Sequence, residues 1–255
     1  MLASVYFGKI SFTLIFALVT ALCLWEILSI FFPSSDWGHR IMGMILGFIP
    51  YFITVASNFD WMDFDTLRVF WVITCLLFLW FVVEMYQNKS KPFENIALLI
   101  LPTIYVGLPF GILHDIGFLG GSYHYSIVMG LMLMTWASDT GAYMVGSRIG
   151  KTPLFPRISP KKTWEGTLGG VLATVLAGWG LSGLFPTLSL QDWLALAVIV
   201  SVFGPIGDLV ESMLKRSYAI KDSSNLLPGH GGALDRFDAF LFMLPFVAVY
   251  LFILR

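Results

Sequence analysis

Eight long apolar segments alternate with short polar stretches in this chain of 255 residues. The segments lie at about 11–32, 41–57, 67–86, 95–113, 125–147, 166–185, 190–207 and 238–254. A helix that crosses the hydrocarbon core of a bilayer needs roughly 20 mostly apolar residues. Only 12% of the residues are charged, whereas soluble domains carry about 25%. The pattern predicts an all-α polytopic membrane bundle with about eight transmembrane segments, formed as a single integral membrane domain over residues 1–255.

The basic residues gather in every second connection between these segments. One side holds Arg40, Lys89, Lys91, Arg148, Lys151, Arg157, Lys161, Lys162, Lys215, Arg216, Lys221 and Arg236, which are twelve of the fifteen Lys and Arg residues. The connections near 58–66, 114–124 and 186–189 contain no Lys or Arg. The positive-inside rule makes the basic side cytoplasmic. We therefore expect a multi-pass membrane protein whose long connections at 148–165 and 208–237 face the cytoplasm. The compact length and the lack of soluble extensions favour a bacterial inner membrane.

The first long basic connection contains Lys161 and Lys162 at a predicted helix start. Ser159 and Thr163 are typical of residues that begin a helix, and Glu165 falls in its first turn. Free N–H groups at a helix N-terminus bind anions, so the two lysines are candidates for a phosphate site. The alternative is a basic cluster that contacts lipid headgroups and sets the topology.

Asp139 lies deep in an apolar segment, where Thr140 and Gly141 follow it. An acidic residue inside a membrane helix is costly and marks a candidate functional position. An interhelical hydrogen bond is the alternative interpretation.

Two carboxylate pairs flank the second long connection. Asp208 and Glu211 are three residues apart, and Asp235 and Asp238 repeat this spacing, so each pair shares one face of a helix. We expect the two pairs to converge on one hard cation, because Mg²⁺ typically uses one or two carboxylates together with substrate phosphates. The chain has no Cys/His cluster for zinc. Glu211 also precedes Lys215 by four residues, so a structural ion pair is the alternative there.

Between these pairs the chain combines bases with glycines. The four bases are Lys215, Arg216, Lys221 and Arg236, and His230 stands among Gly229, Gly231 and Gly232. Glycine permits backbone conformations that other residues avoid and the close approach of a phosphate. This composition indicates a phosphate-rich substrate with a divalent metal. For His230, proton transfer or a headgroup contact competes with a structural role in a turn.

The fixed positions of this region resemble the signature of the phosphatidate cytidylyltransferase (CDP-diacylglycerol synthase) family. The matching run is Ser212-x-x-Lys215-Arg216-x4-Lys221-Asp222-x5-Pro228-x-His230-Gly231-Gly232-x-x-Asp235-Arg236-x-Asp238. The stretches at 139–143, 158–166 and 203–212 are similar to further parts of that family, so the resemblance covers about 136–238 and indicates a catalytic half there. Ala233 stands where a larger aliphatic residue is commoner, which affects packing more than chemistry.

The resemblance implies transfer of the cytidylyl group of CTP to phosphatidate, giving CDP-diacylglycerol and pyrophosphate in phospholipid biosynthesis. It implies a Mg²⁺-dependent enzyme, and a second cation is compatible with it. The implied metal ligands are Asp208 and Asp235, with Asp238 and Asp139 as further candidates. The implied catalytic residues are Lys215, Arg216, Lys221, Asp222, His230 and Arg236, and the implied phosphate-binding residues are Lys161, Lys162, Ser212, Gly231 and Gly232.

The resemblance also implies a homodimer surrounded by membrane lipids, and nothing indicates nucleic acid. Members of the family generally begin with one more hydrophobic helix, so nine segments are expected if such a helix precedes residue 1. Two alternatives stay open. One is another CTP-using lipid enzyme, such as a polyprenol kinase. The other is a transporter with Asp139 and Asp208 as ion-coupling sites, although the charges collect at one membrane edge.

Overall fold

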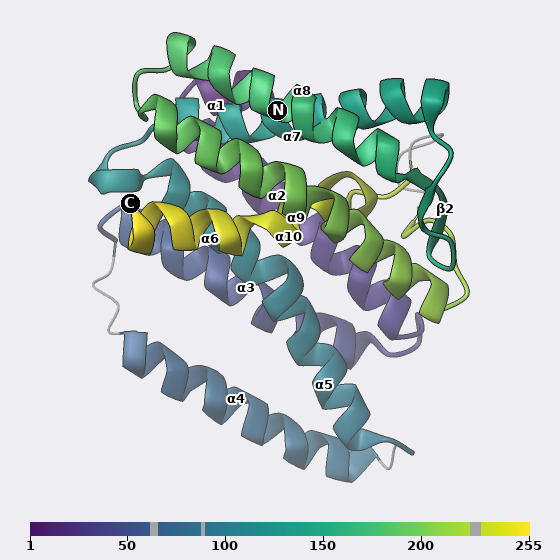
Figure 1. The fold of residues 1–255 in the computed structure, drawn as a ribbon. Helices are drawn as coiled ribbons and strands as arrows, with labels where there is room; N and C mark the ends of the chain where they lie inside the picture. Colours follow the sequence, from purple (N-terminus) through teal and green to yellow (C-terminus); the bar gives the residue numbers. More distant parts are fainter. Residues whose placement is uncertain (62–65, 88–89, 225–230) are drawn as a thin grey trace. The chain divides into compact units, whose positions relative to one another are not determined.

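The computed structural model describes residues 1–61, 66–87, 90–224 and 231–255 (Figure 1). In chain order its elements are α1 (Leu2–Tyr6), α2 (Lys9–Phe31), α3 (Trp37–Asn58), α4 (Thr66–Gln87), α5 (Pro92–Pro102), the π-helix η1 (Thr103–Gly107), α6 (Leu108–Gly117), the 3-10 turn η2 (Leu119–Gly121), α7 (Tyr125–Ile149), β1 (Pro153–Phe155), β2 (Ser159–Thr163), α8 (Trp164–Leu184), α9 (Leu190–Ser217), α10 (Leu234–Val249) and the π-helix η3 (Tyr250–Leu254). Each of the eight predicted apolar segments coincides with helix.

Within the described residues, six helical stretches are long and apolar enough to cross a membrane. They comprise α2, α3, the run from α5 to η2, α8, α9, and α10 with η3. The prediction of a helical polytopic membrane protein is therefore confirmed, whereas the number of eight spans stays a prediction. α7 is not among the six, and Ser138, Asp139 and Thr140 interrupt its apolar sequence. Lys89, one of the bases that set the predicted topology, lies outside the described residues.

Within the described residues, a two-stranded hairpin departs from the all-α prediction. β1 and β2 form an antiparallel hairpin in which Pro153 pairs with Thr163 and Phe155 with Ser159. The predicted helix entry is thus confirmed at Thr163, with Glu165 in the first turn of α8, whereas Ser159 and Pro160 belong to β2. Thr163 does cap that helix, since its hydroxyl oxygen accepts a hydrogen bond from the Gly166 N–H at 3.2 Å.

The second predicted connection also starts later than expected. α9 continues through residues 208–217, so Asp208, Glu211 and Lys215 lie on one helix, as their spacing predicted. Lys215 and Arg216 occupy its last turn, where cations interact favourably with the negative end of the helix dipole. The helix therefore holds these charged side chains at fixed rotational positions.

The chain divides into two compact units, one formed by Met1–Ile15 and Ile116–Arg255 and the other by Phe16–Asp115. The predicted single membrane domain stays a prediction. In the second unit, α3 packs against α5 and η1, and α4 packs against α5. A buried ion pair joins His39 of α3 to Glu84 of α4, and the Asn95 amide donates to Glu84 Oε2 at 3.3 Å.

In the first unit, α7 packs along α8, α8 along α9, and α9 along α10 (Figure 1). Glycines allow the backbones of α7 and α8 to approach closely. A Cβ atom at Gly141 would lie 2.5 Å from Ala173 Cβ and 2.7 Å from the Gly169 carbonyl oxygen. Small residues at such contacts are typical of helix pairs in membranes. This contact fixes Asp139 of α7 relative to the N-terminal end of α8.

We expect Gly141→Ala to lower the free energy of unfolding by about 1–3 kcal/mol, because the added methyl group overlaps the backbone of α8. Gly180→Ala is the matched control, since a Cβ atom at that position of α8 meets nothing within 4 Å. The Gly180→Ala substitution should leave the free energy of unfolding unchanged or raise it by up to about 1 kcal/mol, because alanine favours the helix. Thermal unfolding in detergent measures both variants, and equal unfolding temperatures would contradict the close contact.

Candidate active site

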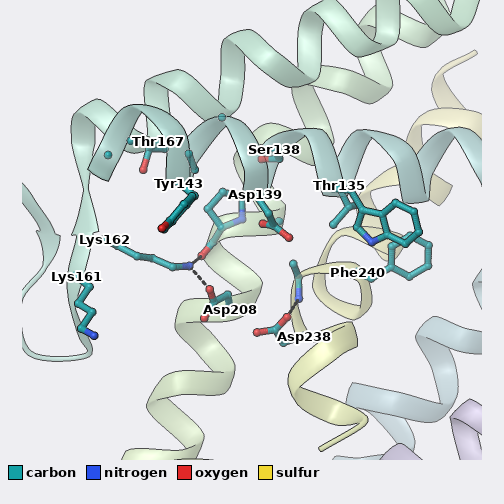
Figure 2. Close-up of a pocket in the computed structure, with 18 of the residues that line it drawn as sticks. Thr135, Ser138, Asp139, Tyr143, Lys161, Lys162, Thr167, Asp208, Asp238 and Phe240 are labelled. Atoms are coloured by element: carbon teal, nitrogen blue, oxygen red, sulfur yellow. Dashed lines mark hydrogen bonds and ion pairs between the residues drawn. The ribbon is translucent and has the colours of Figure 1, made fainter. Parts of the chain in front are cut away.

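A cavity of about 640 Å³ lies between α7, the β-hairpin, α8, α9 and α10, all within the first unit. Figure 2 shows Lys161 and Lys162 at one end and Thr135 and Phe240 at the other. Met132 and Trp136 also line the cavity, so it has a charged end and a largely apolar end. Such a cavity suits an amphipathic ligand whose phosphate lies among charges and whose chain lies against apolar side chains.

Lys162 crosses the charged end of the cavity. Its Nζ atom lies 2.5 Å from Asp208 Oδ2 and donates to the Pro205 carbonyl oxygen at 3.3 Å. Lys161 points away from Asp208 (Figure 2), because successive side chains of a strand alternate between its two faces. The Lys162 and Asp208 side chains are 25% and 39% exposed, so a ligand can reach both without unfolding the site.

Three carboxylates share this space, namely those of Asp139, Asp208 and Asp238 (Figure 2). Asp139 interacts electrostatically with Asp208 and Lys162, and Asp238 interacts with the same two residues. Ser212, one turn along α9, donates its hydroxyl to Asp208 Oδ1 at 3.3 Å. The Lys162 ammonium group therefore lies beside a cluster of acidic side chains at this end of the cavity.

The Asp235 carboxylate also lines the cavity, but it already accepts several hydrogen bonds. Its Oδ1 atom accepts from Lys215 Nζ at 2.6 Å. Its Oδ2 atom accepts from the N–H and hydroxyl of Ser223, each at 3.0 Å, and from the Gly232 N–H at 2.8 Å. Gly231 adopts φ +77°, and a Cβ atom there would lie 2.9 Å from Asp235 Oδ2. Asp235 thus ties the segments on both sides of residues 225–230 to the start of α10.

Lys215 joins two carboxylates behind the cavity wall. Besides Asp235, it contacts Glu211 Oε2 at 3.1 Å, and the Glu211 side chain is fully buried. The ion pair that the four-residue spacing suggested as an alternative is therefore present. Lys215 does not itself line the cavity among the described residues, so its contacts position Asp235 in this structure.

The sequence matches the Cytidylyltransferase family over residues 1–254. The chain belongs to the cytidylyltransferase family. Similar proteins include the phosphatidate cytidylyltransferase of Bacillus subtilis (strain 168), which is 34% identical over 242 residues covering 94% of this chain and 88% of that protein. The phosphatidate cytidylyltransferase of Staphylococcus epidermidis (strain ATCC 12228) is 41% identical over 176 residues, covering 67% and 66%. That of Staphylococcus aureus (strain COL) is 40% identical over 176 residues, with the same coverage.

The cavity of this cytidylyltransferase collects about half of the residues that the sequence singled out. Asp139, Lys161, Lys162, Asp208, Asp235, Arg236 and Asp238 line it. Ser212 contacts Asp208, and Lys215, Gly231 and Gly232 lie around Asp235.

The other predicted residues are not at the cavity in the described part of the chain. Arg216 donates from Nη1 to the Ile220 carbonyl oxygen at 3.2 Å. Lys221 and Asp222 are exposed in the segment after α9. His230 lies outside the described residues. The proposed catalytic roles of all four stay predictions.

Two contributors to this site have little or no signal in the sequence. One is the Pro205 carbonyl oxygen that accepts from Lys162, which no side-chain pattern reveals. The other is Glu165, which the sequence placed only in the first turn of a helix. In the structure its carboxylate accepts from backbone N–H groups of Lys151 and Thr152, across the base of the hairpin.

Proposed function

We propose that this cytidylyltransferase acts on CTP and phosphatidate, forming CDP-diacylglycerol and pyrophosphate. The observation that carries the proposal is the cavity itself, in which Lys162, Asp139, Asp208 and Asp238 meet at one end and apolar side chains line the other. A lipid phosphate and a nucleotide triphosphate can share the charged end while acyl chains lie along the apolar end. The relatives named phosphatidate cytidylyltransferase support the same reaction.

In the proposed reaction, a phosphate oxygen of phosphatidate attacks the α-phosphorus of CTP. A new phosphorus–oxygen bond forms there while the bond to the β-phosphate breaks, and pyrophosphate leaves with that electron pair. The nucleophile is already anionic near neutral pH, so no Ser or Cys nucleophile is required. The main obstacle is the repulsion between two anions, which positioning and charge neutralisation overcome. Lys162, whose ammonium group reaches Asp208, and Arg236 are the bases at the cavity that can hold the phosphates, whereas the Lys161 side chain points away from Asp208 (Figure 2).

The acidic residues of the cavity fit a Mg²⁺ ion that the substrate phosphates help to bind. In the described residues, no group of three or more His, Cys, Asp and Glu side chains forms a complete metal site. An incomplete protein site is what Mg²⁺ normally uses, with one or two carboxylates beside substrate phosphates. We assign this role to Asp208 and Asp238, with Asp139 beside them. Asp235 already accepts from Lys215, Ser223 and Gly232, so its carboxylate is less available to the ion.

When bound, Mg²⁺ would neutralise part of the triphosphate charge. Lys162 would then move from Asp208 to a phosphate, since one ammonium group cannot fully serve both. A second cation stays part of the proposal because three carboxylates share the space.

We further propose that the cavity faces the cytoplasm of a bacterial inner membrane. The hairpin that carries Lys161 and Lys162 lies in the connection that the positive-inside rule assigns to that side, where CTP is available. The homodimer implied by the family resemblance belongs to the same proposal, and native mass spectrometry of the purified protein tests it directly.

Lys162→Ala should reduce kcat/KM for cytidylyl transfer by about 10²–10³-fold, the usual effect of removing one well-placed charge-stabilising donor. Lys161→Ala is the matched control from the same strand, because its side chain points away from Asp208 (Figure 2). Exposed charge contacts are worth less than about 1 kcal/mol. The kcat/KM of the Lys161→Ala control should therefore fall by less than about tenfold. Initial rates with purified protein measure both, and equal losses would contradict the assignment of Lys162.

The proposed function is tested with purified protein in detergent supplied with CTP, phosphatidate and Mg²⁺. Mass spectrometry should detect CDP-diacylglycerol, and a coupled assay should detect one pyrophosphate for each lipid product. Protein that is folded but forms neither product, with or without Mg²⁺, would contradict the proposal.

A further inference from the structure

The hairpin that carries Lys162 is too small to hold its own position. β1 has three residues and β2 has five, and their antiparallel register is irregular between Pro153 and Phe155. An isolated two-stranded hairpin is marginally stable in water at best. The placement of Lys162 therefore depends on how the base of this hairpin is attached to α8.

The Glu165 carboxylate forms that attachment. Its Oε2 atom accepts from the Lys151 N–H at 3.1 Å. Its Oε1 atom accepts from the Thr152 hydroxyl at 2.9 Å, and the Thr152 N–H lies 3.2 Å from both oxygens. Three donors from two consecutive residues before β1 thus converge on one side chain in the first turn of α8.

A backbone hydrogen bond closes the same junction from the other side. The Trp164 N–H donates to the Thr152 carbonyl oxygen at 3.0 Å. Thr152 is therefore held through its N–H, its hydroxyl and its carbonyl oxygen, and Pro153, the next residue, pairs with Thr163. These contacts fix the base of β2 one residue away from Lys162.

We propose that Glu165 is a positioning residue, which holds the hairpin on α8 so that Lys162 reaches Asp208 and the substrate phosphate. Glu165 lines no part of the cavity in the described residues, so it acts through Lys162 and not on the substrate. Without its carboxylate, two backbone N–H groups lose their acceptor and the start of β1 can leave α8. The Lys162 ammonium would then sample positions away from Asp208.

The competing explanation is that Glu165 only stabilises α8, since acidic residues in a first turn interact favourably with the helix dipole. Glu94 offers a matched control, because it also lies in the first turn of a helix, α5, and pairs there with exposed Lys91. It belongs to the other compact unit. If Glu165 only stabilises its helix, Glu165→Ala and Glu94→Ala should have similar effects on kcat/KM and on the exchange of the Lys151 and Thr152 amides.

A double-mutant cycle between Glu165 and Lys162 tests the proposal. Glu165→Ala should lower kcat/KM by about 10–100-fold, the range seen when a residue supporting an active group is removed. Glu165→Gln should lower kcat/KM by a smaller factor, because its amide oxygen still accepts a hydrogen bond from Thr152. The double variant Glu165→Ala/Lys162→Ala should be no slower than Lys162→Ala alone, since Glu165 acts through that lysine. Losses that multiply would overturn the proposal.

Hydrogen exchange provides a second readout that needs no activity. The amides of Lys151 and Thr152 should exchange faster in Glu165→Ala than in the wild type, while Glu94→Ala leaves them unchanged. Unaltered exchange at both amides would overturn the proposed attachment. The double-mutant cycle measures kcat/KM and therefore rests on the proposed function, whereas the hydrogen-exchange experiment does not. A wild-type protein that makes no lipid product would therefore contradict the function and leave the exchange result as the test of the attachment.

Discussion

Asp208→Asn should reduce the rate of cytidylyl transfer by about 10³-fold or more while leaving the protein folded. Asp208 stands between Asp139, Asp238 and Lys162 at the charged end of the cavity. The amide keeps the shape of the side chain but removes the charge that the proposed Mg²⁺ site requires. A thousandfold loss corresponds to about 4 kcal/mol of transition-state stabilisation. Initial rates at saturating CTP measure the effect.

Stability should change much less than activity in this variant. The Lys162–Asp208 pair is partly exposed, and such pairs contribute about 0–1 kcal/mol. Removing one of three neighbouring carboxylates also relieves repulsion. Glu94→Gln makes the same chemical change at an exposed site of the other unit, and it should keep full activity. Full activity in Asp208→Asn would remove the proposed metal role.

Lys215→Met should destabilise the first unit by about 3–5 kcal/mol, the usual cost of leaving a buried charge without its partner. Lys215 lies between Glu211 and Asp235, whose side chains are 0% and 12% exposed. Total stabilities are about 5–15 kcal/mol, so this loss is a large share and should appear in thermal unfolding. Lys161→Met, which removes an exposed lysine of the hairpin, should leave the unfolding temperature nearly unchanged.

A second substitution distinguishes lost charge balance from lost packing. Glu211→Gln removes the buried negative charge that Lys215→Met leaves unpaired, so the double variant should recover part of the lost stability. If the double variant is no more stable than Lys215→Met alone, the ion pair is not the source of the effect.

The membrane helices were predictable because their apolar segments are long and separated by polar connections. The hairpin was not, because Ser159–Thr163 lacks an alternating apolar pattern and contains residues typical of a helix start. The contacts that hold it come from backbone groups of Lys151 and Thr152, which have no sequence signal. This error also concealed the different directions of Lys161 and Lys162, since their alternation follows from a strand.

The acidic residues show which side-chain contacts can be predicted from their spacing in the sequence. The four-residue spacing of Glu211 and Lys215 correctly suggested an ion pair. It did not reveal that Lys215 also contacts Asp235, 20 residues away, because that contact depends on how α9 and α10 pack. The two predicted carboxylate pairs consequently differ. Asp208 and Asp238 face the cavity together with Asp139, whereas Glu211 is buried behind it.

We expect the cytidylyl group of CTP, and not its terminal phosphate, to be transferred to the lipid at this cavity. Purified protein with phosphatidate and Mg²⁺ should be supplied in parallel with CTP labelled at the α-phosphate and at the γ-phosphate. Lipid-extractable label should come from α-labelled CTP alone and should be lost in Asp208→Asn. Lipid label from γ-labelled CTP would contradict cytidylyl transfer, because it would indicate a CTP-dependent lipid kinase.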